Sequence, residues 1–316
     1  NGTGIRDWVA HLENFTDVED VLCVDCTRES YVGVAIDPAL QALWDSWEDP
    51  ATQYVKPFKI FDNVYYVGID WVSAYLIDTG DGLVLIDSLY GKWVPLLMNN
   101  IRAVGFNPSD IKYVINTHGH FDHAGGSAYL QKVHGAEIVM TAKDWAIARA
   151  EPELPQFYMP QPNVDIVAKD GDTITLGDNT FELFNTPGHT TGVLSIRYKV
   201  REGDNEYTAM TLGGVGLNFS GVARTETYIK SYERLQSMQN GTSVSLPNHQ
   251  EMGKVFARRD LAAAQPSGAA NPFVNPDSYK QDLSAFLTAA KVKLAQEKAG
   301  TAPTELEALK NAITDS

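Results

Sequence analysis

One short segment of the chain gathers side chains that bind metals. His118, His120, Asp122 and His123 lie within six residues, in the pattern H-x-H-x-D-H. Imidazole nitrogens and carboxylate oxygens are ligands of zinc and similar divalent metals. In an extended loop the first two histidines can point the same way, whereas a following helical turn brings Asp122 and His123 round toward a second point. The spacing therefore predicts two adjacent metal ions.

Two further histidines lie in loop-like contexts. His189 lies in a Pro-Gly-His-Thr loop after the predicted strand 180–184, and His249 lies in a Leu-Pro-Asn-His loop after the short apolar stretch 244–246. Loops at strand ends are where functional sites are usually assembled, so both are predicted to join the metal site. His11 and His134 lack such a context and are predicted to be surface residues.

The scaffold can be read from hydrophobic periodicity and turn signals. The predicted strands are 64–67, 74–77, 83–86, 111–115, 137–140, 173–176, 180–184, 193–198 and 207–212. The predicted helices are 38–48, 92–104, 124–134, 225–239, 250–264 and 276–298. Residues 152–162 are rich in proline and are predicted to form a long loop. Two β-rich blocks, each followed by helices, favour a sheet-on-sheet core with helices outside.

Composition narrows the class of protein. The chain has 316 residues, of which 44% are hydrophobic and 21% charged, with a formal net charge of -15. This charge argues against nucleic-acid partners and anionic membrane surfaces. The apolar runs are too short to span a bilayer. A small-molecule substrate is therefore expected, and the oligomeric state cannot be read from the sequence.

Weaker signals indicate a secreted protein, extracellular or periplasmic. The chain begins at Asn1, which is consistent with a removed signal peptide or a trimmed chain. The two cysteines are spaced C-x-x-C and are expected to form a local disulfide, with free thiols as the alternative. Asparagines of N-x-Ser/Thr sequons stand at Asn1, Asn14, Asn218 and Asn240, and the cysteines are Cys23 and Cys26.

The metal motif, with Gly-His-Thr at 188–190 and His249 downstream, resembles the metallo-β-lactamase superfamily. Within it, the chain most resembles the subclass B3 β-lactamases and B3-like hydrolases, from about Phe58 onward. The resemblance implies an α/β fold, an αββα sandwich over residues 56–316, with residues 1–55 as an N-terminal extension. It implies that one Zn²⁺ is held by His118, His120 and His189, and a second by Asp122, His123 and His249. Asp122 would also orient a hydroxide shared by the two ions.

The stretch 212–216 departs from two patterns of the family. Lactonases and glyoxalase II carry a bridging aspartate between the last two histidines, and this stretch has no carboxylate. That difference favours a B3-like site. The B3 β-lactamases hold the substrate carboxylate with serines near this place, and glycines stand here instead. The resemblance therefore supports the metal site more firmly than a β-lactam substrate.

Other residues are candidates with two interpretations each. Asp87 ends a predicted strand and would orient a ligating imidazole by a hydrogen bond, or would simply occupy a turn. Trp71, Phe121 and Phe219 lie beside the motifs and would line a substrate pocket, or would pack in the core. Arg224 would bind an anionic substrate group, or would be a solvated charge at a helix start.

The sequence thus predicts a zinc-dependent hydrolase that acts through a dinuclear-site hydroxide, foremost on a lactam, meaning a β-lactam or another cyclic amide. The alternatives within the same chemistry are a lactone, ester or thioester hydrolase and an isothiocyanate hydrolase. A metal-binding protein without turnover is the alternative from another class. A nuclease is disfavoured by the acidic charge.

Overall fold

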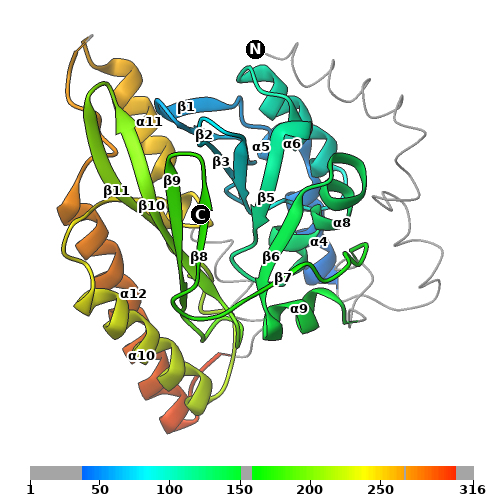
Figure 1. Cartoon of the computed structure of the whole chain (residues 1–316). Coiled ribbons are helices and arrows are strands. Elements are labelled where there is room, and N and C mark those ends of the chain that lie inside the picture. Colours follow the sequence, from blue (N-terminus) through cyan, green and yellow to red (C-terminus); the bar gives the residue numbers. More distant parts are fainter. Residues whose placement is uncertain (1–37, 151–158, 267, 304–316) are drawn as a thin grey trace.

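The computed structural model describes residues 38–150, 159–266 and 268–303. In this part of the chain, two β-sheets face each other and helices cover both outer faces (Figure 1). The predicted αββα sandwich is therefore confirmed. The predicted boundary at residue 55 stays a prediction. His11, Cys23, Cys26 and the sequons at Asn1 and Asn14 lie outside the described residues, as does most of the predicted 152–162 loop.

The first sheet has its seven strands in sequence order. They are β1 (Phe58–Phe61), β2 (Val64–Tyr66), β3 (Tyr75–Asp78), β4 (Leu83–Ile86), β5 (Ile111–Ile115), β6 (Glu137–Thr141) and β7 (Ile166–Ala168). Strands β1 to β4 pair antiparallel, and β4 to β7 pair parallel. Every residue of β4 is buried, because this apolar strand is covered on both faces.

Helices pack on the outer face of the first sheet. They are α4 (Pro38–Glu48), α5 (Pro50–Gln53), α6 (Trp93–Ala103), α7 (Phe121–Ala124), α8 (Ser127–Tyr129) and α9 (Ala142–Ala148). Their apolar side chains share a core cluster with Leu76, Leu85 and Val114 of the sheet. The N-terminal helices α4 and α5 belong to this layer, since Trp44 and Tyr54 pack against the same cluster.

The second sheet is ordered β12-β11-β10-β9-β8. Its strands are β8 (Thr173–Leu176), β9 (Asn179–Asn185), β10 (Leu194–Glu202), β11 (Asn205–Thr211) and β12 (Thr242–Ser245). All pairs are antiparallel except β11 with β12. Its outer face is covered by α10 (Val222–Ser237) and α12 (Pro276–Ala299), while α11 (Val255–Ala264) packs Phe256 against Phe58 and Tyr66 of the first sheet.

The predicted helix at 124–134 is wrong as a single element. The chain there forms α7, then α8, and then a π-helical turn at Leu130–His134. A Cβ on Gly126 would stand 2.3 Å from the carbonyl oxygen of Ser88, so the backbones approach too closely for a larger residue. Helix α9 and the short strands β1, β7 and β12 were absent from the predicted elements.

Candidate metal centre

Five strand ends meet at one edge of the sandwich. Asp87 follows β4, the H-x-H-x-D-H segment follows β5, and His189 follows β9. The glycine-rich stretch 213–216 follows β11, and His249 lies beyond β12. Carboxyl ends of parallel strands lie at the same edge of a sheet, which is where α/β folds bind ligands. The fold thereby brings all six predicted metal ligands together.

The first half of the centre consists of three histidines. The Nδ1 atom of His120 lies 3.1 Å from Nε2 of His118 and 3.0 Å from Nε2 of His189. His118 and His189 are buried, whereas His120 is partly exposed. Their ligand atoms all lie within 4.8 Å of one another. The three nitrogens thus face a common point that is open to solvent beside His120.

Hydrogen bonds on the far side of the rings decide which nitrogens carry lone pairs. The Nδ1–H of His189 donates to the carbonyl oxygen of Gly216 at 2.9 Å. Thr117 donates its hydroxyl proton to Asp87, so its oxygen accepts from Nδ1 of His118 at 3.1 Å. Each neutral imidazole carries one N–H, so both Nε2 atoms present lone pairs to His120.

The second half consists of Asp122, His123 and His249. An oxygen of Asp122 lies 3.0 Å from Nε2 of His123 and 3.8 Å from Nε2 of His249, and these two nitrogens are 3.2 Å apart. The Nδ1–H of His123 donates to Asp87 at 2.7 Å, and that of His249 donates to the carbonyl oxygen of Trp71 at 2.8 Å. Nε2 of His249 is therefore an acceptor, whereas Nε2 of His123 becomes one only after the protonated ring loses its second proton.

These donor sets fit a pair of zinc ions. The ligand atoms of each set lie between 3.0 and 3.8 Å from a neighbour in the same set, at distances that a shared metal ion could bridge. Three imidazoles in one half, and two imidazoles with a carboxylate in the other, are ligand sets that zinc takes in catalytic sites. His118 also lies within 4.8 Å of Asp122 and His123. The division of ligands between two ions, and metal binding itself, stay predictions.

The two halves differ in their proton affinity. Burial, together with neighbouring histidines, holds the pKa of His118 and His189 well below the usual value, and burial lowers that of His120 to about 4. Burial also acts on His123, but Asp122 and Asp87 overcome it and raise its pKa to about 10. Burial opposes ionisation of Asp122, yet the adjacent histidines hold its pKa well below the ordinary range.

Asp87 organises both halves. Its carboxylate accepts from the Thr117 amide at 2.7 Å, from the Thr117 hydroxyl at 2.9 Å and from His123 at 2.7 Å. Its backbone has φ of 61°, a left-handed conformation that aspartate tolerates better than most residues. The predicted orienting contact of Asp87 is confirmed, and the predicted turn is also present, so the two interpretations were compatible.

Close backbone contacts explain two glycines of the site. A Cβ on Gly119 would stand 2.3 Å from the carbonyl oxygen of Asp144, so only glycine fits between His118 and His120. Gly214 has φ of +54°, and a Cβ there would lie 2.9 Å from that of His189. The backbone at 214 is therefore pressed against a predicted ligand, which leaves no room for a side chain at this position without displacement.

Sequence reasoning missed several supporting groups. Asp144 in α9 is a buried carboxyl, and burial raises its pKa to about 7 against the opposing effects of Thr190 and the Gly119 amide. The carbonyl oxygens of Gly216 and Trp71 hold two predicted ligands. A carbonyl carries no sequence signal. Helix α9 could have been predicted, because Thr141 followed by Asp144 in the first turn is a pattern typical of a helix N-terminus.

The four predicted substrate-binding residues fall into two groups. Trp71 and Phe121 are partly exposed, and the Trp71 ring lies 5.6 Å from that of His249. Phe219 is only 1% exposed and packs on Tyr228, so its predicted place in a substrate pocket is wrong and the core interpretation holds. Arg224 donates to the carbonyl oxygens of Gly188 and His189, which supports the ligand turn. Anion binding by Arg224 stays a prediction.

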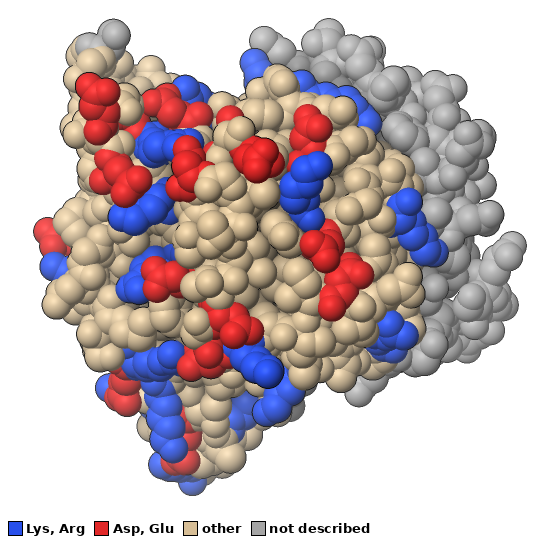
Figure 2. All heavy atoms as spheres, viewed as in Figure 1, with Lys and Arg blue, Asp and Glu red and all other residues tan. Residues whose placement is uncertain are grey.

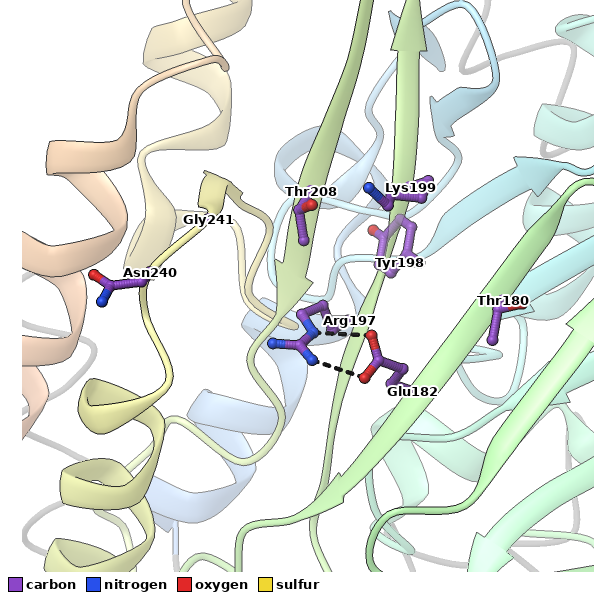
Figure 3. A pocket seen from close by; sticks show the side chains of 8 residues that line it. All are labelled: Thr180, Glu182, Arg197, Tyr198, Lys199, Thr208, Asn240 and Gly241. Atoms are coloured by element: carbon purple, nitrogen blue, oxygen red, sulfur yellow. Dashed lines mark hydrogen bonds and ion pairs between the residues drawn. The ribbon is translucent and has the colours of Figure 1, made fainter.

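A separate pocket lies on the second sheet, away from the metal centre. Figure 3 shows its lining residues, which are Thr180, Glu182, Arg197, Tyr198, Lys199, Thr208, Asn240 and Gly241. Arg197 and Glu182 are joined by two hydrogen bonds of 3.0 and 2.7 Å, and Lys199 pairs with Glu206 at 3.0 Å. Acidic and basic side chains are similarly interspersed over the face in Figure 2. Because Arg197 and Lys199 are already paired with glutamates, we do not expect this pocket to bind an anion strongly.

The chain is similar to known proteins over the region that carries five of the six predicted ligands, from His118 to His189. Residues 68–202 match the metallo-beta-lactamase superfamily. An N-acyl homoserine lactonase of a Bacillus species is 28% identical over 148 residues, or 40% of this chain and 57% of that protein. A hydroxyacylglutathione hydrolase of Maricaulis maris is 34% identical over 97 residues, or 31% of this chain and 32% of that protein. The chain thus spans about half or less of these curated relatives.

Similarity to solved structures extends further. BJP-1, a subclass B3 metallo-beta-lactamase of Bradyrhizobium japonicum, superposes with a TM-score of 0.72 at 28% identity, covering 80% of this chain and 99% of that one. The chain thus matches the metallo-β-lactamase superfamily over residues 68–202 and has a fold similar to that of a subclass B3 enzyme, and both findings support a metallo-hydrolase. Among the described helices, none has the length and apolar character needed to cross a membrane.

Proposed function

We propose that this protein is a two-zinc hydrolase that opens a lactam, either a β-lactam or another cyclic amide. The observation that carries the proposal is the side-by-side arrangement of two ligand sets, one of three imidazoles and one of two imidazoles with a carboxylate. The similarity to a B3 enzyme over 99% of that enzyme's chain supports it. Localisation outside the cytoplasm remains part of the proposal, on the sequence signals alone.

The residues of the chain divide the work. His118, His120 and His189 would hold one ion, and the carboxylate half would hold the other. Bound zinc supplies an activated water at neutral pH and a Lewis acid for the carbonyl. Asp122 stays ionised because its pKa is low, so it can accept a hydrogen bond from the attacking water and orient it. Asp87 keeps His123 aligned throughout.

The stretch after β11 supports the choice of substrate class. No carboxylate stands at 212–216, and the close contacts of Gly214 explain why a larger residue would not fit there. The stretch also offers no hydroxyl to a substrate carboxylate, which favours cyclic amides other than the clinical β-lactams as natural substrates. Lactone hydrolysis is the second candidate, because a lactonase is among the curated relatives.

A substrate panel tests the proposal. Zinc-loaded protein is offered β-lactams, other lactams, lactones, thioesters and an isothiocyanate, and ring opening or product release is followed. We expect turnover of at least one lactam, and its loss when a chelator removes zinc. Turnover of lactones alone would replace the lactam proposal with the second candidate. Tight zinc binding without turnover of any substrate would favour a metal-binding protein.

A further inference from the structure

The N-terminal helices place aromatic rings beside the metal centre. Trp47, in the last turn of α4, stacks on Trp71 with ring centroids 3.8 Å apart and planes within 6°. The Trp71 ring in turn lies 5.6 Å from the ring of His249. A residue of the predicted N-terminal extension is therefore separated from a predicted metal ligand by a single indole.

The cluster extends to the other half of the centre through Phe121. Phe121 directly follows His120, and its ring centroid lies 6.2 Å from that of Trp71, 6.5 Å from Trp47 and 5.7 Å from Trp44. These four aromatic residues are all partly exposed. We call Trp44, Trp47, Trp71 and Phe121 the aromatic wall. Rings that served only the core would be buried, as Trp93 is.

Specific contacts hold the wall in place. The Glu48 carboxylate pairs with Lys92 at 2.9 Å, and the carbonyl oxygen of Trp47 accepts from Tyr90 and Trp93, each at 3.2 Å.

Gln53 is the last residue of α5. Its side-chain oxygen accepts a hydrogen bond from the Trp71 amide at 3.0 Å, and its backbone carbonyl oxygen accepts one from the Asp70 amide at 2.9 Å. Gln53 is only 6% exposed. The helices are thus joined to the loop that carries Trp71, so the stacked pair is a built part of the site edge.

We propose that the aromatic wall binds a flat apolar group of the substrate, such as an aryl ring, next to the bond that is cleaved. The inference rests on the proposed function and narrows its substrate class to compounds that carry such a group. Partly exposed indoles offer a large apolar face and stack with other rings in offset geometry. The wall flanks His249 in the carboxylate half of the centre. Trp47 is then a specificity residue supplied by the N-terminal extension.

Binding of two thiols tests the wall without any turnover. A thiolate binds zinc through sulfur, and 2-phenylethanethiol differs from ethanethiol only by the ring. Calorimetric titration of the zinc-loaded full chain gives both dissociation constants. We expect the aryl thiol to bind about three- to tenfold more tightly, the range of one aromatic contact. Trp47→Ala and Trp71→Ala should each bring this ratio close to one, and Trp47→Ala, which does not contact a predicted ligand, should do so through the aryl thiol alone.

The matched control is Tyr207→Ala. Tyr207 is a partly exposed aromatic residue near the start of β11, at the opposite end of that strand from the site, and its loss should keep the wild-type ratio. If Trp47→Ala disturbs α4 in circular dichroism, Trp47→Leu keeps apolar volume without an indole face and should also lower the ratio.

The outcomes separate the two proposals. An absent aryl preference in the wild type, or one that both tryptophan variants retain, overturns the wall even if lactams are hydrolysed. A preference lost in both variants supports the wall even if no panel substrate is turned over, in which case the proposed reaction fails alone. With an active panel substrate, Trp47→Ala should raise KM for aryl compounds more than for matched compounds without a ring.

Discussion

The two halves of the metal centre are built from similar side chains in opposite electrostatic settings. In the three-histidine half, burial and neighbouring imidazoles depress every pKa, so each ring is neutral at neutral pH and carries one N–H. In the other half, His123 lies between two carboxylates, Asp87 at 2.7 Å and Asp122 at 3.0 Å, and keeps a proton up to a pH of about 10.

This difference means that protons compete with metal in one half only. The three-histidine half is ready to accept a cation without losing a proton, although the three rings are neutral and the carboxylate of Asp122 belongs to the other predicted ligand set. The carboxylate half attracts a cation more strongly but must first release the proton of His123. Zinc affinity is therefore limited by desolvation in the three-histidine half and by proton release in the carboxylate half.

Replacing a predicted metal-ligating histidine should have the largest effect. His120→Ala deletes the nitrogen that both neighbouring imidazoles face, and His249→Ala deletes one from the other half. Each should lower turnover by on the order of a thousandfold, because both ions take part. Each should also remove about one zinc per chain, measured by elemental analysis. His134→Ala, which lies beside Ser109 outside the centre, is the control. Unchanged turnover in both ligand variants would refute the two-metal site.

Asp87→Asn should lower zinc affinity in the carboxylate half more than in the three-histidine half. The change keeps the shape of the side chain but removes a charge from His123, so zinc affinity in the carboxylate half should fall about 10- to 100-fold. The three-histidine half touches Asp87 only through Thr117, so its affinity should change much less. Competition with a chromophoric chelator measures both affinities. Equal losses in the two halves would show that the contrast is wrong.

Proton release should distinguish the two binding events. Because the pKa of His123 is about 10 in the metal-free protein, zinc binding to its half at pH 8 should release about one proton. Binding to the three-histidine half should release none. Calorimetry in two buffers of different ionisation enthalpy counts these protons, and the Asp87→Asn variant should release fewer.

The same raised pKa has a consequence for folding. A group with a higher pKa in the folded state stabilises it fully below its unfolded pKa of about 6.5, and this contribution disappears as pH rises through about 10. The free energy of unfolding of the metal-free protein should therefore decrease over that range. Urea denaturation at several pH values measures it, and a flat profile would argue against a protonated His123.

Arg224→Ala should have the smallest effect. The guanidinium supports the carbonyl oxygens at 188 and 189 and lies over the ring of Phe219 at 4.8 Å. Its loss should reduce the stability of the metal-free protein by about 1–3 kcal/mol. Removal of this nearby positive charge should also raise the pKa of His120, which Arg224 lowers. Thermal unfolding and the pH dependence of zinc binding test the two effects. An Arg224→Lys variant keeps the charge and should retain the lower pKa.

Particular residues show how far sequence reasoning reached. His118 to His123 could be assigned because their spacing is local and their chemistry unusual, and β4 and β5 could be assigned because they are apolar runs bounded by turns. The helix at 124–134 failed because Gly125 and Gly126 are needed for close backbone approach to the 88–90 turn, which periodicity does not encode. Phe219 failed because a lone aromatic residue beside a motif does not reveal which way it points.

The amino-acid sequence by itself determined the types of the candidate ligands, their order along the chain and the strands that precede His118 and His189. Only the tertiary structure decided that Asp87 joins both halves, that carbonyl oxygens at 71 and 216 orient two imidazoles, and that Trp47 stands beside His249. The physical reason is that these contacts join segments far apart in sequence, some through backbone atoms that every residue carries. Their geometry exists only once the strands have paired and the layers have packed.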